Sequence, residues 1–523
     1  MRFRRTNPND PPKPQRSTRG RMLITGLAGA LCVFAFAPFG WWPLEILGLA
    51  TLFYQVLRST SVKSAALIGW AFVAGWTAAG VHWLYVSMHT YGGMPAPLAA
   101  LAVLLLGAAM GVYGALAMGT AWWLRQRWTL PLPAANLLVF PAVWALFEWV
   151  RGWLFTGFPW LSSGYAHNHS PLAGFAPVIG VYGLGWLAAV IAGALLLLLH
   201  RSRLRAAALA VTICVAGAGL GFLQWTYPEG KPISVRLLQG NIPQDEKFNG
   251  AKIVTTMKLY QDAITAAPAD LIATPETAII TLPQQLPPDY LPGIAQFLNK
   301  TNSNLILGIF TADSQTAYFN SVIGIPAKLG SGYYRYDKHH LVPYGEFIPY
   351  GFRWFVNLMS IPLGDMTSGR EIQPAFPIKD QRVLPNICYE DLFGEEIAAQ
   401  LNRPALDQKP ATMLLNTSNL AWFGDTIAIP QHLQISQMRS LETGRPMLRA
   451  TNTGATAIIN GEGKVVQQLP VNTFGTLAAT VQGMAGSTPY IIWGNKLFLA
   501  LTALSLAGAW FWAKRSKNQP KAA

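Results

Sequence analysis

Residues 97–124 read PLAALAVLLLGAAMGVYGALAMGTAWWL, an apolar run without Asp, Glu, Lys or Arg. A helix needs about 20 such residues to cross the hydrocarbon core of a bilayer. The chain of 523 residues is 51% hydrophobic and 12% charged, whereas soluble domains carry about 25% charged residues. One soluble domain is therefore excluded. The sequence predicts eight membrane spans, at 22–38, 41–57, 65–86, 97–124, 134–150, 177–199, 205–222 and 490–513.

The basic residues are distributed unevenly around these runs. The net charge is +15, and the short connections on one side of the predicted spans contain only Arg151. The two tails and the connections on the other side hold Arg2, Arg4, Arg5, Lys13, Arg16, Arg19, Arg21, Arg58, Lys63, Arg125, Arg127, Arg201, Arg203, Arg205, Lys514, Arg515, Lys517 and Lys521. Because cytoplasmic connections carry the excess of Lys and Arg, this pattern predicts that both termini lie in the cytoplasm.

The same pattern predicts the domain organisation. Residues 1–21 form a basic cytoplasmic tail, 22–222 seven transmembrane helices, 223–489 an outward domain, 490–513 the eighth helix and 514–523 a second cytoplasmic tail. An odd number of spans precedes the large domain, so it faces the periplasm in a bacterium with two membranes. The expected location is the inner membrane.

The outward domain has a globular composition. It carries 19 Lys and Arg against 21 Asp and Glu, so it lacks the basic surface that nucleic acid requires, and no nucleic-acid partner is expected. Short β-rich runs, among them Ile233–Leu238, Leu305–Phe310 and Met413–Asn416, alternate with helical stretches at 251–267, 289–300 and 430–444. This alternation predicts an α/β layered domain.

Three reactive side chains follow predicted strands of this domain, where catalytic groups often lie. Glu276 follows Leu271-Ile-Ala-Thr-Pro, Lys338 follows Tyr333-Tyr-Arg-Tyr-Asp, and Cys388 follows Val383-Leu-Pro-Asn-Ile. Cys388 is the only thiol of residues 223–489. A helix N-terminus and a nearby lysine would favour its thiolate. From position alone, a nucleophile and a buried inert thiol are both open.

The motifs around these residues resemble a known constellation. Thr274-Pro-Glu-Thr, Tyr334-Arg-Tyr-Asp-Lys-His-His-Leu-Val-Pro-Tyr-Gly-Glu and Ile387-Cys-Tyr-Glu are similar to the Glu–Lys–Cys motifs of the nitrilase superfamily. Supporting stretches are Leu238-Gln-Gly-Asn-Ile-Pro-Gln and Ala421-Trp-Phe-Gly. With the eight predicted spans, the whole chain is similar to the apolipoprotein N-acyltransferase family.

The resemblance implies a fold and a reaction. The fold is a nitrilase-like αββα sandwich, inserted between spans seven and eight. Cys388 is the implied nucleophile, Glu276 the general base and Lys338 the oxyanion stabiliser. The implied acyl donor is the sn-1 ester of a phospholipid, which gives a thioester on Cys388. The implied acceptor is the α-amine of an S-diacylglyceryl-cysteine lipoprotein, and neither metal nor organic cofactor is implied.

Further residues match or depart from the family pattern. Glu346, Tyr389 and Glu390 match positions that support the three reactive side chains, although packing and helix capping would explain the last two equally well. Phe248 stands where the family often has Trp, so an indole N–H is lost. Leu420 stands where the family often has Asp, and any role of that Asp does not transfer.

An apolar connection follows the lysine motif. Residues 347–370 include Phe352, Trp354 and Phe355 and are interpreted as a membrane-facing lid that admits lipid; ordinary packing onto the spans is the alternative. Phe248, Trp354, Phe355 and Trp422 are the candidate residues for contact with lipid substrate.

Two other functions remain open at the level of the sequence. A membrane-anchored amidase or nitrile hydrolase would use the same Glu276, Lys338 and Cys388 on small substrates, although one span would suffice to anchor it. A transporter with an outward binding domain is the other alternative. Oligomeric state and the preferred phospholipid are not predicted.

Overall fold

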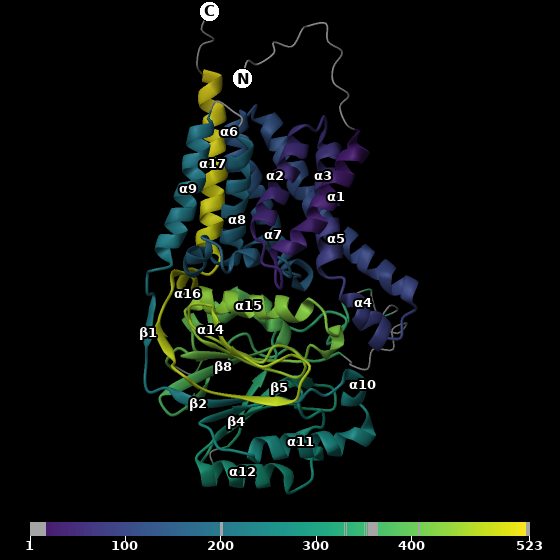
Figure 1. The fold of residues 1–523 in the computed structure, drawn as a ribbon, viewed down its shortest axis with the longest axis vertical. Coiled ribbons are helices and arrows are strands. Elements are labelled where there is room, and N and C mark those ends of the chain that lie inside the picture. The colour runs from purple at the N-terminus through teal and green to yellow at the C-terminus, as the bar shows by residue number, and fades with distance from the viewer. Residues whose placement is uncertain are drawn as a thin grey trace, which may run out of the picture.

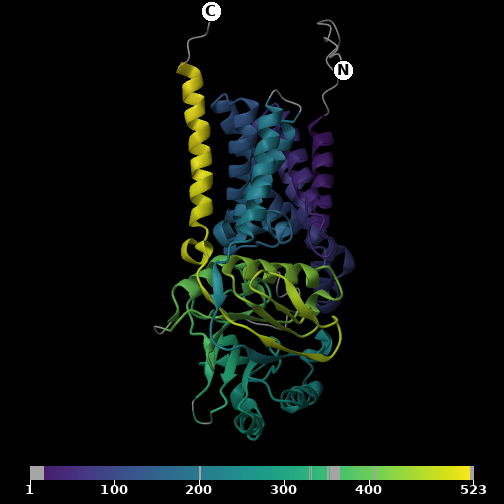
Figure 2. The ribbon, with the colours of Figure 1, turned by 60° about the vertical axis from the view of Figure 1, so that its left-hand side comes forward.

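The computed structural model describes residues 17–198, 202–328, 330, 332–349, 351, 353, 365–405 and 408–518. A bundle of helices stands on a layered α/β domain, and the α/β domain lies in the chain between α9 (Arg203–Leu220) and α17 (Lys496–Asn518) (Figure 1). The first described helix, α1 (Thr18–Leu31), begins at the end of the bundle that is remote from the α/β domain, and α17 ends there (Figures 1 and 2).

A helix lies at each of the eight predicted runs. Six are long and apolar enough to cross a membrane: Val62–Gly80 (α3), Ala96–Arg127 (α5), Leu132–Arg151 (α6, η3 and α7), Ala173–Leu196 (which includes α8, Ala176–Leu196), Arg203–Leu220 (α9) and Lys496–Arg515 within α17. The helix α2 (Pro43–Leu57) is apolar but shorter, and α1 has 14 residues. The membrane-helical part of the prediction is confirmed, and the count of eight spans stays a prediction.

Glycines allow close packing within the bundle. A Cβ atom added to Gly69 of α3 would lie 2.1 Å from the carbonyl oxygen of Gly114 in α5. Close approach of two backbones at small residues is the usual way in which membrane helices pack, because lipid offers no hydrophobic driving force between them.

The α/β domain contains two six-stranded sheets. Strands run in the order β13-β2-β3-β4-β5-β6 in one sheet and β12-β11-β10-β9-β8-β7 in the other. The first consists of β2 (Ile233–Gln239), β3 (Leu271–Ala273), β4 (Asn304–Ala312), β5 (Tyr318–Ile325), β6 (Tyr334–Asp337) and β13 (Gly475–Val481). The second consists of β7 (Phe376–Ile378), β8 (Gln381–Ile387), β9 (Met413–Ser418), β10 (Met447–Thr451), β11 (Ala457–Ile459) and β12 (Val465–Gln468).

Burial on both faces of the sheets produces four layers. Alternate apolar residues from both sheets, such as Val235 and Leu415, form one core between them. The outer face of the first sheet packs against α11 (Ile253–Thr265) and α12 (Tyr290–Thr301), and the outer face of the second against α14 (Gly394–Asn402) and α15 (Ala428–Thr443). The predicted αββα layering is therefore present.

The helix α15 also faces the membrane helices (Figure 1). Ala428, Ile435 and Met438 of α15 belong to the same buried core as the membrane helices, together with Tyr389 and Phe393. The chain segment that begins at Cys388 therefore lies where the α/β domain meets the helix bundle.

Candidate active site

The three predicted reactive residues lie where strands end. Glu276 follows β3 at the turn Thr274–Pro275, Lys338 follows β6, and Cys388 lies between β8 and the short 3-10 helix η9 (Cys388–Leu392). Strands β3 and β6 belong to one sheet and β8 to the other, and the two sheets share one core. The three strand ends therefore lie close together. Cys388 has a φ of 53°, a left-handed conformation that non-glycine residues adopt rarely.

Buried charges surround the lysine. Lys338 Nζ lies 3.3 Å from Glu276 Oε1 and 2.9 Å from Glu346 Oε1. Lys338 is 1% exposed, and both carboxylates are buried. Burial opposes the charge of Lys338, but Glu346 and Glu276 outweigh burial and raise its pKa above the ordinary value, so the side chain stays an ammonium. The structure thus brings Glu276, Lys338 and Glu346 together.

Asn320 on β5 completes this centre. Its Nδ2 donates to Glu276 Oε1 and to Glu346 Oε1, both at 2.7 Å. The other oxygen of Glu276, Oε2, accepts from the main-chain N–H of Asn419 at 2.9 Å. Glu276 is held by donors on both oxygens, which orients it without covering the whole carboxylate.

The surroundings of Cys388 shift the pKa of its thiol. Burial raises the pKa of the thiol well above its ordinary value, the charge of Glu276 raises it further, and Lys338 offsets only part of the shift. Lys338 thus acts on the thiol in the direction expected of a nearby lysine, whereas burial and Glu276 oppose the thiolate. Cys388 needs a base to take its proton, and Glu276 is the carboxylate whose charge acts most strongly on it.

Glu390 ties two strand ends together. Its Oε2 accepts from the main-chain N–H of Ile387 at 2.6 Å, and its Oε1 accepts from that of His339 at 2.7 Å. The hydroxyl of Tyr336 donates to it as well. Burial raises the pKa of Glu390 to about 7. This residue fixes the turn that carries Cys388 against the strand that carries Lys338, so it positions both.

Tyr389 points away from this centre. Its hydroxyl donates to the carbonyl oxygen of Gly157, in the loop that follows α7, at 3.0 Å. Its ring lies beside His340 and Phe393. The structure places Tyr389 at the contact with the helix bundle.

The main-chain carbonyl of Cys388 accepts hydrogen bonds from two side chains. Asn416 Nδ2 donates to it at 3.2 Å, and so does His432 Nε2 at 3.2 Å. Arg449 donates to His432 Nδ1 at 2.9 Å, which leaves the proton of the neutral ring on Nε2. The His432 ring stacks on Trp160 of the helix bundle, with centroids 5.7 Å apart. These contacts hold the left-handed backbone of the nucleophile in place.

The candidate substrate residues separate into two groups. Phe248 follows the short helix α10 (Gln244–Lys247), and its ring lies 6.4 Å from that of Trp422, which in turn lies 6.1 Å from Tyr91 of the helix bundle. Trp354 and Phe355 lie outside the described residues, as do most residues of the predicted lid. Leu420, the other departure from the family pattern, is buried in the core beside α15.

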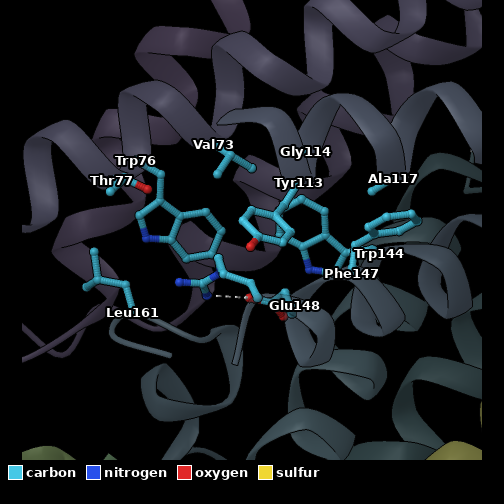
Figure 3. Close-up of a pocket in the computed structure, with 11 residues that line it drawn as sticks. Val73, Trp76, Thr77, Tyr113, Gly114, Ala117, Trp144, Phe147, Glu148 and Leu161 are labelled. Carbon is cyan, nitrogen blue, oxygen red and sulfur yellow. Dashed lines mark ion pairs between the residues drawn. The ribbon is translucent and has the colours of Figure 1, made fainter. Parts of the chain in front are cut away.

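Figure 3 shows a second feature, a pocket within the helix bundle. Trp76 and Trp144 line it, together with Glu148 and Arg151, which form an ion pair of 3.7 Å. Arg151 also donates to two carbonyl oxygens of the following loop, and Glu148 accepts from the N–H of Ser163. The pair fixes that loop, and none of the three reactive residues lines the pocket.

Several site residues were not predicted. Asn320 lies in an otherwise apolar strand, and an isolated polar pair, Asn320-Ser321, was its only signal. Lys247 lies three residues after the stretch Leu238–Gln244, and its Nζ donates to the main-chain carbonyl of Glu276 at 3.0 Å. His432 carried no signal, because its partner Trp160 is distant in sequence. Among the described residues no group of three or more His, Cys, Asp or Glu side chains could hold a metal ion.

Comparisons with known proteins agree with the two-part architecture. A family model described as "Apolipoprotein N-acyltransferase N-terminal domain" matches residues 28–194, and one described as "Carbon-nitrogen hydrolase" matches residues 234–490. A relative from Ralstonia nicotianae named apolipoprotein N-acyltransferase is 51% identical over 93% of this chain and 92% of its own length. Relatives of the same name from Nitrosomonas europaea and Bordetella bronchiseptica are 43% and 41% identical, each over 93% of this chain and 96% of their own length.

Proposed function

The chain belongs to the apolipoprotein N-acyltransferase family, and from that premise we propose that it moves the sn-1 acyl chain of a phospholipid to the α-amine of an S-diacylglyceryl-cysteine lipoprotein. A thioester on Cys388 links the two half-reactions in a ping-pong sequence. One observation carries the proposal. The charge of Glu276, a buried carboxylate that is itself held by Lys338 and Asn320, acts on the half-buried thiol of Cys388.

In the first half-reaction Glu276 takes the thiol proton of Cys388, and the thiolate attacks the ester carbonyl carbon. The carbonyl oxygen becomes an oxyanion, which the fixed ammonium of Lys338 stabilises. Collapse of the intermediate breaks the ester C–O bond, and Glu276 returns the proton to the departing alkoxide. The products are the acyl thioester and a lysophospholipid.

In the second half-reaction the lipoprotein amine attacks the thioester carbon. Glu276 removes a proton from the nitrogen, the C–S bond breaks, and the proton passes to the sulfur of Cys388. The amide product leaves and the free thiol is restored. Glu346 takes no proton in this scheme. It holds Lys338 at 2.9 Å and keeps the ammonium charged.

The membrane arrangement follows from the sequence pattern. The seven spans of residues 22–222 precede the catalytic domain, residues 223–489, which lies in the periplasm; the eighth span, 490–513, returns the chain to the cytoplasm. Both tails, 1–21 and 514–523, are cytoplasmic, and the enzyme resides in the inner membrane. The contact between α15 and the helix bundle supports access of lipid to Cys388, because Tyr389 and Phe393, which follow Cys388 in the chain, share a buried core with the membrane helices.

A transfer assay tests the proposed function. The purified enzyme is incubated with a phospholipid labelled in its sn-1 chain and with a synthetic diacylglyceryl-cysteine peptide. We expect labelled amide and unlabelled lysophospholipid in equal amounts. The variant Cys388→Ala should form neither product. Transfer by Cys388→Ala would contradict the mechanism. Release of free fatty acid without amide, or hydrolysis of small amides instead, would favour the amidase alternative.

A further inference from the structure

A chain of amide groups next to Glu276 ends in a free donor. The main-chain N–H of Ile242 donates to Asn452 Oδ1 at 2.9 Å, and Asn452 Nδ2 donates to Asn419 Oδ1 at 3.0 Å. Asn419 Nδ2 then donates to Gln244 Oε1 at 2.9 Å. Because the first donor is a main-chain N–H, the oxygen and nitrogen of every amide in the chain are fixed.

Gln244 Nε2 is the last donor of this series of amide groups, and it has no acceptor among the described residues. The side chain is 4% exposed. A buried donor without an acceptor costs free energy, so native proteins retain few of them. An unpaired donor beside a catalytic base points to a ligand that supplies the acceptor.

Lys247 offers a second donor from the same helix. It is 5% exposed, and its one hydrogen bond within the described part of the chain is to the carbonyl oxygen of Glu276. An ammonium has three protons, so two are available. That bond holds the lysine against the main chain of the catalytic base. Gln244 and Lys247 lie three positions apart on α10 and therefore share one side of the helix.

We propose that Gln244 Nε2 and Lys247 Nζ bind the phosphodiester group of the acyl donor. This inference rests on the proposed function. A buried cation and a neutral N–H donor side by side match an anion with two free oxygens. In a phospholipid the glycerol backbone joins the phosphate to the sn-1 ester, so phosphate held at α10 would direct that ester toward Cys388.

The surroundings of α10 suit a lipid headgroup. Phe248, directly after Lys247, lies next to Trp422, and Trp422 lies next to Tyr91 of the helix bundle. The polar pair is thus bordered by aromatic side chains on the side of the molecule where α4 (Leu84–Val86) descends from the bundle (Figure 1). Apolar chains can lie against the aromatic rings while the phosphate meets Gln244 and Lys247.

Substitutions at the two residues separate phosphate binding from chemistry. Gln244→Glu keeps the oxygen that accepts from Asn419 and replaces the free donor with an acceptor. Lys247→Met removes the charge, and Lys247→Arg keeps it. The control Lys258→Met removes an exposed lysine of α11 that pairs with Asp262. Each protein is tested with a phospholipid and with a diacylglycerol of the same acyl chains, which has the same sn-1 ester but no phosphate.

The readout is the ratio of kcat/KM for acylation of Cys388 by the two donors. We expect Gln244→Glu and Lys247→Met to lower this ratio about 10- to 100-fold, the size expected when a hydrogen bond to a charged group is lost. Lys247→Arg and Lys258→Met should keep the ratio close to that of the wild type. Thermal unfolding is measured to check that each variant is folded. If Gln244→Glu does not fold, the comparison of Lys247→Met with Lys247→Arg tests phosphate binding by itself.

Two results would overturn the inference. If both donors lose activity equally in the variants, Gln244 and Lys247 act on Glu276 or Cys388 and not on the phosphate. If neither donor is affected, the two residues have no part in donor binding. Failure of the proposed function has a different signature, because the wild type would then form no acyl-Cys388 from either donor.

Discussion

Asn320 is the residue on which the orientation of both carboxylates depends. Its single amide nitrogen donates to Glu276 and Glu346, and its main-chain carbonyl accepts from the N–H of Lys338 at 2.8 Å. We expect Asn320→Ala to lower kcat/KM about 10- to 100-fold, since two charge-assisted hydrogen bonds are lost. Asn320→Asp should cost more and should move the acidic limb of the pH–rate profile upward, because a third carboxylate in this centre disfavours further negative charge there.

The profile of N-acylation against pH measures both effects. Asn304→Ala is the matched control, because Asn304 is a buried strand residue that bonds only to main-chain groups at the far end of β4. It should change thermal stability without moving the pH profile. A profile for Asn320→Asp that coincides with the wild type would show that Asn320 does not act on the base.

Lys247 makes the proposed binding of the phospholipid phosphate depend on pH. Burial lowers the pKa of Lys247 to about 8, although the charges of Glu276 and Cys388 favour the ammonium. Below pH 8 the side chain is charged and binds phosphate, and above pH 8 it is neutral. We expect the preference for phospholipid over diacylglycerol to fall as the pH rises through about 8, and to persist to higher pH in Lys247→Arg. A preference that is constant from pH 7 to 10 would contradict a role for the charge.

The sequence motifs predicted Glu276, Lys338 and Cys388 and the supporting carboxylates Glu346 and Glu390, but not the amides and the second lysine around them. Glu276, Lys338 and Cys388 stand in short, recognisable stretches after strands, so resemblance was enough to locate them. Asn320, Gln244 and Lys247 act through hydrogen bonds to groups that are distant in sequence. The unpaired amide nitrogen of Gln244 results from the order of donors and acceptors along a hydrogen-bond network. The amino-acid sequence alone does not show that order.

Among the secondary-structure elements, the loop after α7 is decisive for the position of Cys388. Trp160 in this loop is 4% exposed, donates to Gln431 of α15 at 2.8 Å and stacks on His432. Trp160→Ala should destabilise the protein by about 3–5 kcal/mol and should slow acylation of Cys388, because His432 loses its support. Trp153→Ala, in the same loop but 48% exposed, is the control.

Thermal unfolding and single-turnover acylation are measured for both variants. Acylation at the wild-type rate in a folded Trp160→Ala protein would show that the helix bundle does not position the nucleophile. A similar loss in both variants would indicate a general effect of the loop on lipid access.

Prediction succeeded for long, buried elements and failed for short or exposed ones. The core strands and the helices α11, α12 and α15 lie within a few residues of their predicted positions, since their apolar residues recur with a clear period. The four-residue helix α10 and the edge strands β7, β12 and β13 were missed. Such elements are too short or too exposed to show a period, and α10 carries the proposed donor site.

At the scale of the whole molecule, the distribution of positive charge predicts the orientation in the membrane. The basic side chains lie in the tails and in one set of connections, while the domain of residues 223–489 is close to neutral. Alkaline phosphatase fused after Gly230 should therefore be active, because this enzyme folds only outside the cytoplasm, and the same fusion after residue 523 should be inactive. An inactive fusion at Gly230 would overturn the count of seven preceding spans.

In the proposed mechanism the acyl chain is bound to Cys388 between the two half-reactions. The direct measurement is the intact mass of the purified enzyme after incubation with phospholipid in the absence of any lipoprotein acceptor. We expect a mass increase of one acyl chain, located on Cys388 and lost when a diacylglyceryl peptide is added, with none in Cys388→Ala. An enzyme that transfers acyl chains to the peptide while its own mass never changes would contradict a covalent intermediate on Cys388.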